Sequence, residues 1–284
     1  MTFTLPAPAK LNLFLHINSR REDGFHELQT LFQFLEYGDD IEFTPIRGND
    51  IVLEPALADV RSEDNLVMRA ARLLQREANS PLPGVRMTLT KRLPMGGGVG
   101  GGSSDAATTL LGLNYFWGLN LSIDKLAALG LTLGADVPVF VRGFAAFAEG
   151  VGEKLTRANP PEDWFVVLKP DCNINTGLIF SQEGLTRNTP RITIAPAFEG
   201  DASRYRNDCE DMVCGLYPEV GKSLEWLKQF GPARLTGTGA CIFGRFPTES
   251  DAQAVWARKP SGINGFVTRG VNHSPLHTKL TELD

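Results

Sequence analysis

A glycine-rich segment in the first half of this sequence has the composition of a phosphate-binding loop. Glycine lets the backbone approach an anion closely and adopt positive φ, and the free N–H groups at the start of a helix attract negative charge. The sequence therefore predicts that this segment binds the phosphates of a nucleotide. Its residues are Pro94, Met95, Gly96, Gly97, Gly98, Val99, Gly100, Gly101, Gly102, Ser103 and Ser104.

The loop matches neither of the two common nucleotide-binding patterns in full. Its glycines fit GxGxxG, but the preceding residues 85–90 alternate between apolar and polar types, whereas a dinucleotide-binding strand is a continuous apolar run. No lysine follows the glycines, as the pattern GxxxxGK[ST] would need. Because phosphoryl transfer requires a cation beside the transferred group, the lysine must come from elsewhere, and Lys10 is the candidate.

Lys10 falls in a predicted strand, residues 9–17, in which apolar residues alternate with other types. Lys10 and Asn12 lie on one face of this strand together with Phe14. A polar face in contact with solvent is the ordinary explanation for such a pair. Phe14 weakens that explanation, and the spacing would let Lys10 and Asn12 both reach a transferring phosphate.

Asp136 is the only charged residue between Leu126 and Val141. One interpretation is the N-cap of a short helix that has Pro138 in its first turn. The other is a catalytic carboxylate in a dry cleft, where burial and a neighbouring cation would set its pKa. The sequence leaves both open.

Phe25 and His26 follow a turn at Asp23-Gly24. They could be an ordinary exposed loop in which the ring of Phe25 packs on the core. They could also recognise a nucleobase, because an aromatic ring stacks on a base and an imidazole can hydrogen-bond its edge.

The elements that must position these residues alternate between strands and helices. Further strands are expected at residues 31–43 and 51–53, with a helix from around Ser62 to Glu77. After the glycine loop, Ser103 and Ser104 are expected to cap a helix that ends near Gly118, and a second helix should start near Ser122.

The second half has the order strand, two helical stretches, two strands, helix and strand, which fits an α+β sandwich of ferredoxin-like type. Gly237, Thr238 and Gly239 join the two middle strands. Residues 181–206 are expected to be mostly loop, and the polar, proline-containing residues 158–163 to link two domains, 1–157 and 158–284.

The bulk composition excludes several classes of protein. With 284 residues, two domains are the better expectation. A net charge of −5 argues against a non-specific binder of nucleic acid or of anionic membranes. The four cysteines form no metal-binding cluster, and no signal peptide or membrane-length apolar run is evident, so a cytoplasmic protein is expected.

Three segments together resemble the three signature motifs of the GHMP kinases, in this order along the chain: residues 8–13, 94–104 and 235–241. Within that superfamily, residues 21–26, 133–138 and 207–210 are similar to the 4-diphosphocytidyl-2-C-methyl-D-erythritol kinases. The resemblance implies a two-domain α+β fold: an N-terminal ribosomal-protein-S5-like α/β domain, a C-terminal ferredoxin-like domain, and an active site in the cleft between them.

The same resemblance implies transfer of the γ-phosphate of ATP, with Mg²⁺, to the 2-hydroxyl of a cytidyl diphosphate of methylerythritol. It makes Asp136 the base and Lys10 the cation, with residues 94–104 on the ATP phosphates. The other implied contacts are Asn65 and Lys91 near the adenine, Asn12 on the substrate, Phe25, His26 and Phe180 around the cytosine, and Thr176, Gly237, Thr238 and Gly239 beside the diphosphate. Residue 25 is often Tyr in this family, and Phe keeps the stacking face.

The implied partners are this small molecule alone, without nucleic acid or membrane, for a monomer or weak homodimer. No side chain is predicted as a metal ligand. The alternatives are another small-molecule GHMP kinase, of mevalonate or homoserine type, and a non-catalytic nucleotide-binding relative. A base-binding pair at Phe25 and His26 argues against the first, and retention of both Lys10 and Asp136 argues against the second.

Overall fold

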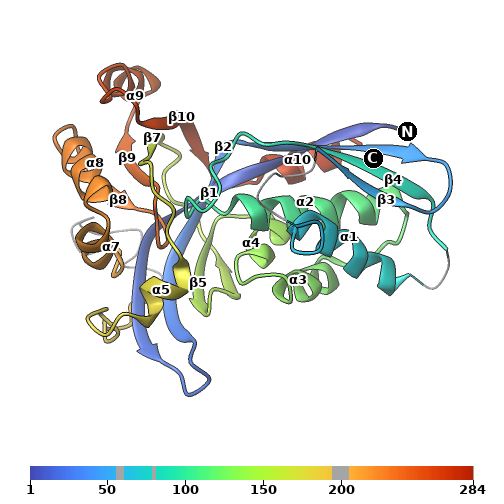
Figure 1. The fold of residues 1–284 in the computed structure, drawn as a ribbon, viewed down its shortest axis with the longest axis horizontal. Helices are drawn as coiled ribbons and strands as arrows, with labels where there is room; N and C mark the ends of the chain where they lie inside the picture. The colour runs from blue at the N-terminus through green and yellow to red at the C-terminus, as the bar shows by residue number, and fades with distance from the viewer. Residues whose placement is uncertain (56–60, 79–80, 194–204, 284) are drawn as a thin grey trace.

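Two long antiparallel strands, β1 (Phe3–Arg20) and β2 (His26–Ile46), run through both halves of the molecule (Figure 1). The computed structural model describes residues 1–55, 61–78, 81–193 and 205–283. β1 extends well beyond the predicted residues 9–17. Buried apolar residues continue it on the N-terminal side, and residues 18–20, which are polar, continue it on the other side through their pairing with β2. Its pairing with β2 shifts register between Asn12 and Leu15, so simple alternation does not hold along the whole strand.

The N-terminal half packs helices against the sheet that β1 and β2 begin (Figure 1). The predicted helix near residue 62 begins at Leu66, with Asn65 as its N-cap: the side chain of Asn65 accepts a hydrogen bond from the Val67 N–H. The added strands are β3 (Ile51–Glu54), β4 (Gly84–Thr90), β5 (Ala146–Gly150) and β6 (Lys154–Arg157). The helices are α1 (Leu66–Glu77), α2 (Gly101–Phe116), α3 (Ile123–Leu131) and α4 (Val137–Arg142).

The expected cap of α2 is wrong. The helix begins at Gly101, and its N-cap is Gly100 in the left-handed region, with φ of 77°. Ser103 and Ser104 therefore lie inside the first turn and cap nothing. A Cβ atom on Gly100 would come within 2.8 Å of the Phe140 ring, so glycine is required at this entry to the helix.

The C-terminal half is ferredoxin-like, as predicted. Its strands hydrogen-bond in the order β10-β7-β9-β8, all antiparallel, and α9 lies between β9 and β10 in sequence. The strands are β7 (Trp164–Lys169), β8 (Ala233–Leu235), β9 (Ile242–Phe246) and β10 (Asn264–Val271). The helices are α5 (Thr176–Ser181), α7 (Glu210–Leu216), α8 (Pro218–Lys228), α9 (Glu249–Trp256) and α10 (Pro275–Thr281).

The two halves share one hydrogen-bonded sheet, because β10 pairs with β2 at Gly270 and Val271. Each half has its own hydrophobic core, here called the N-terminal and the C-terminal core. Each core also contains residues from the other half of the sequence. Leu276 of α10 is fully buried in the N-terminal core, and Leu15 and Ile17 of β1 are buried in the C-terminal core. The boundary at residues 157 and 158 stays a prediction.

Most of the predicted loop 181–206 has no helix or strand where it is described, and residues 194–204 of it lie outside the described residues. Within the described part of the chain, no helix is both long and apolar enough to cross a membrane.

Candidate active site

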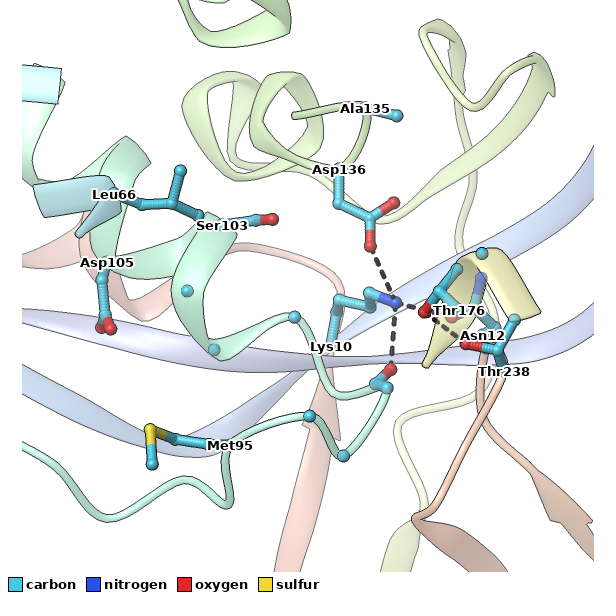
Figure 2. A pocket seen from close by; sticks show the side chains of 18 of the residues that line it. Lys10, Asn12, Leu66, Met95, Ser103, Asp105, Ala135, Asp136, Thr176 and Thr238 are labelled. Carbon is cyan, nitrogen blue, oxygen red and sulfur yellow. Dashed lines mark hydrogen bonds and ion pairs between the residues drawn. The ribbon is translucent and has the colours of Figure 1, made fainter. Parts of the chain in front are cut away.

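A cavity of about 760 Å³ opens where the two halves meet (Figure 2). Residues from the three GHMP kinase motifs and from segments 21–26 and 133–138 line it, whereas none of residues 207–210 does. The glycine loop and the start of α2 form one side. Lys10 and Asn12 of β1 form the floor, with Asp136 on the α4 side. The residues at 25–26, the start of α5, and the turn between β8 and β9 complete the wall.

The three sequence motifs are joined by hydrogen bonds into one unit. The backbone N–H of Lys10 donates to the Val99 carbonyl at 2.9 Å, and the N–H of Cys241 donates to the Gly97 carbonyl at 3.0 Å. The Thr236 hydroxyl accepts from the Asn12 N–H at 3.0 Å and lies 3.3 Å from the Gly98 carbonyl. The position of the glycine loop therefore depends on the two motifs that flank it in space.

The loop needs its glycines where it passes these neighbours. Gly98 has φ of 74°, and a Cβ atom there would lie 2.3 Å from the Thr236 carbonyl oxygen. Just beyond it, α2 presents the N–H groups of its first three residues, which have no partner within the helix. Gly101, Gly102 and Ser103 of that turn line the cavity, an arrangement suited to phosphate.

Lys10 provides the cation that the loop lacks. Its ammonium lies 2.6 Å from Asn12 Oδ1, 3.1 Å from the Gly98 carbonyl and 3.1 Å from Asp136 Oδ2 (Figure 2). The side chain of Lys10 is only 3% exposed. Burying an ammonium is costly, so this set of three oxygens is what makes the position tolerable.

Asp136 occupies the N-cap position of α4, but its side chain makes no capping hydrogen bond. It points at Lys10 instead. Of the two interpretations that the sequence left open, the catalytic one assumed burial, but the side chain of Asp136 is 34% exposed. It lines the cavity, so one face of the ion pair is open to a ligand.

Asn12 has both ends of its amide engaged. Its oxygen accepts from Lys10 and its Nδ2 donates to the Thr30 hydroxyl at 2.9 Å. This network orients the amide beside Lys10. The substrate contact predicted for Asn12 stays a prediction.

At the far end of the glycine loop, Lys91 bridges two buried carboxylates. Its ammonium lies 2.5 Å from Asp39 and 2.9 Å from Asp105. Burial would lower the pKa of Lys91, but the two carboxylates outweigh it, so the pKa is raised. Burial raises the pKa of Asp105 to about 7, because one ammonium cannot fully compensate two carboxylates. Lys91, Asp105 and the helix cap Asn65 all line the cavity.

The opposite end of the cavity is aromatic. His26 is buried and stacks on Phe180, with ring centroids 5.0 Å apart and planes at 29°. Phe25 lines the cavity and is 63% exposed as a residue. Thr176 lies on the same helix as Phe180, and its hydroxyl is 2.8 Å from that of Thr238 (Figure 2). Gly237 lines the same cavity. Gly239 was predicted in this wall but does not line the cavity; it packs against Leu235.

Comparison with known proteins agrees with this arrangement. The family model described as GHMP kinases N terminal domain matches residues 65–144, and that described as GHMP kinases C terminal matches residues 199–259. A Marinobacter nauticus protein named 4-diphosphocytidyl-2-C-methyl-D-erythritol kinase is 71% identical over 99% of this chain and 98% of its own length. The chain belongs to that family of GHMP kinases. The resemblance of the motifs is thereby confirmed.

Other relatives of the kinase extend this comparison. A Haemophilus influenzae protein of the same name is 57% identical over 98% of this chain and 88% of its own length. A crystal structure of 4-(cytidine 5'-diphospho)-2C-methyl-D-erythritol kinase superposes with a TM-score of 0.83 at 32% identity, over 94% of this chain and 99% of that one. A mevalonate kinase structure has a TM-score of 0.70 at 15% identity, over 95% of this chain and 100% of that one, which shows a shared fold only.

Three residues of the kinase's site region were not predicted from the sequence. Asp39 and Asp105 hold Lys91, and Arg187 donates to His26. Asp105 follows Ser103 and Ser104, where the sequence predicts the start of a helix and no other role. Asp39 and Arg187 lie in segments with no motif, and only their partners in space mark them out.

Proposed function

We propose that this kinase transfers the γ-phosphate of ATP to the 2-hydroxyl of 4-diphosphocytidyl-2-C-methyl-D-erythritol, in the non-mevalonate route to isoprenoid precursors. The observation that carries this proposal is the ion pair of Lys10 and Asp136, at 3.1 Å, on the wall of a cavity that also contains the glycine loop. The family of the chain supports the choice of substrate.

The phosphates of ATP bind along residues 94–104, where backbone N–H groups and the start of α2 stabilise their charge. Mg²⁺ arrives with ATP as part of the substrate. Among the described residues there is no group of three or more His, Cys, Asp or Glu side chains that could hold a metal ion. The phosphate oxygens and water would supply most of its ligands, as is common for Mg²⁺. The adenine lies toward Asn65 and Lys91.

The transfer step uses both members of the ion pair. The substrate oxygen forms a bond to the γ-phosphorus, the bond to the bridging oxygen breaks, and ADP leaves. The proton of the hydroxyl passes to Asp136, whose Oδ2 lies 3.1 Å from the Lys10 ammonium. Lys10 also neutralises charge on the transferred group, and Asn12 lies beside it.

The aromatic end of the cavity holds the cytosine. Phe25 and Phe180 supply stacking faces and His26 a hydrogen bond to the edge of the base. Thr176, Thr238 and Gly237 lie beside the diphosphate that links the base to the methylerythritol. The four cysteines are free thiols, which fits a reducing cytoplasm.

An Asp136→Asn variant tests the proposal. A positioned base contributes about 10²–10⁴-fold, so we expect turnover of the cytidyl substrate to fall by about that factor. The KM for ATP should change little, because the carboxylate contacts the hydroxyl side of the reaction. The assay is ADP release with the cytidyl diphosphate substrate, run beside mevalonate and homoserine.

Asp124→Asn is the matched control, because Asp124 is an acid on α3 with an 83% exposed side chain. It should retain wild-type turnover. ADP release with mevalonate or homoserine, and none with the cytidyl substrate, would overturn the proposed function. Near-wild-type turnover by a folded Asp136→Asn enzyme would remove Asp136 from the role of base.

A further inference from the structure

All the N–H groups of the Arg187 guanidinium donate hydrogen bonds at the aromatic end of the cavity, to backbone carbonyls of residues 180–185 and to the His26 ring. Its Nη2 donates to the carbonyls of Phe180 and Gln182, at 2.8 and 2.7 Å. Its Nη1 donates to those of Glu183 and Leu185, at 3.4 and 3.2 Å. The fifth donor, Nε–H, points at His26 Nε2 at 3.0 Å. A guanidinium has five N–H donors, and each of them has an acceptor here.

The contact with His26 determines where the imidazole carries its proton. An arginine is always a donor, so His26 Nε2 must be the unprotonated nitrogen and accept. Burial lowers the pKa of His26, and the positive charge of Arg187 lowers it further, so the ring is neutral near pH 7. The single proton of a neutral imidazole is then on Nδ1.

That proton remains available to a ligand. Among the residues that the structure describes, the Nδ1 of His26 has no hydrogen-bond partner, and His26 lines the cavity. Stacking on Phe180 holds the plane of the ring, and Arg187 binds the Phe180 carbonyl as well. One side chain therefore positions both the imidazole and the aromatic ring beside it.

We propose that Arg187 is a positioning residue that fixes His26 as an Nδ1–H donor and thereby makes the site select cytosine over uracil. This inference rests on the proposed function, since it concerns the base of that substrate. Cytosine presents an unprotonated N3 that accepts a hydrogen bond, whereas uracil carries a hydrogen on N3. A donor held opposite N3 pairs with cytosine and meets another donor in uracil, which leaves both groups unsatisfied.

The first test is the protonation of His26 in the free wild-type enzyme. Long-range ¹H–¹⁵N NMR distinguishes a protonated ring nitrogen from an unprotonated one. We expect Nδ1 protonated and Nε2 unprotonated in the wild type, with a shift toward Nε2–H in Arg187→Gln. A wild-type His26 protonated on Nε2 would overturn the proposal, whether or not the variant folds.

The second test compares cytidyl and uridyl forms of the substrate. In Arg187→Gln we expect the KM for the cytidyl form to rise about tenfold or more with kcat less affected, and the cytidyl-to-uridyl ratio of kcat/KM to fall at least about tenfold. The KM for ATP should not change. A helix-capping role alone would lower the melting temperature and leave this ratio unchanged, which would overturn the proposal.

Arg191→Gln is the matched control. It removes the same charge from the same segment, but Arg191 is 60% exposed and pairs with Glu27. Among the described residues, the hydrogen bond to the His26 imidazole comes from Arg187 and not from Arg191. It should keep the wild-type ratio. A wild-type enzyme with no activity on the cytidyl form would overturn the proposed function, while the NMR result would still decide whether Arg187 sets the tautomer of His26.

Discussion

Replacing Asp105 with asparagine should change how the stability of the kinase depends on pH. The Asp105 side chain is 5% exposed, and one of its oxygens bonds to Lys91 while the other has no partner among the described residues. Lys91 also binds the fully buried Asp39. Asparagine has nearly the same shape as a protonated aspartic acid, so the variant mimics the neutral form at every pH.

The magnitude follows from the raised pKa of Asp105, about 7 in the folded protein against an ordinary value of 3.8. Below pH 3.8 both the folded and the unfolded chain hold the proton. Between that pH and about 7, the unfolded chain has released the proton and the folded chain has not, so stability falls as the pH rises. The slope is about 1.4 kcal/mol per pH unit, and above pH 7 the loss is complete. From about pH 5.5 to about pH 8.5, the ionisation of Asp105 should therefore lower the unfolding free energy of the wild type by about 2 kcal/mol. Asp105→Asn has no ionisable group there and should not show this decrease.

The assay is urea unfolding of both proteins at those two pH values. The quantity to compare is the difference in unfolding free energy between variant and wild type, which should move by about 2 kcal/mol in favour of the variant at the higher pH. Any fixed effect of the substitution on Lys91 cancels in that comparison. Asp124→Asn, on the 83% exposed side chain, should keep the wild-type dependence. A difference between wild type and Asp105→Asn that is the same at both pH values would refute the reasoning.

Two other substitutions separate the roles of the two ends of the cavity. Gly98→Ala would place a Cβ atom 2.3 Å from the Thr236 carbonyl, so we expect the KM for ATP to rise at least about tenfold and the melting temperature to fall, measured by kinetics and thermal unfolding. Phe25→Ala removes the ring of a residue that is 63% exposed, so the melting temperature should not change. Loss of base stacking, worth about 1–3 kcal/mol, should raise the KM for the cytidyl substrate by about 5–150-fold; an unchanged KM would exclude Phe25 from stacking.

The fold was predictable wherever local pattern and tertiary structure agree. The ferredoxin-like half followed from alternating strands and the glycines that separate them, as at Gly237 and Gly239. The start of α2 was not predictable by the same rules. Serine normally caps a helix, but Gly100 can enter the helix in a conformation closed to serine, and only the nearby Phe140 ring shows why this position must be glycine.

The site was predictable where the chemistry of phosphate binding requires a particular type of residue. A phosphate loop without its own lysine implied a lysine from elsewhere, and Lys10 lies 3.1 Å from the Gly98 carbonyl. Asp105 and Arg187 were missed for the opposite reason. Acids and arginines are common on surfaces, and what distinguishes these two is a partner far away in sequence, Lys91 or His26, that no local pattern specifies.

The absence of a lysine in the glycine loop has a structural consequence. The Gly98 carbonyl receives Lys10 from β1 and the Thr236 hydroxyl from the end of β8, so the loop is completed by residues from both ends of the chain. β1 itself continues from Lys10 into the C-terminal core, where Leu15 is buried. The cation, the carboxylate and the loop all come from the N-terminal half of the chain. The carbonyls of Gly97 and Gly98, however, accept hydrogen bonds from Cys241 and Thr236 of the C-terminal half, so the position of the loop depends on formation of the whole fold.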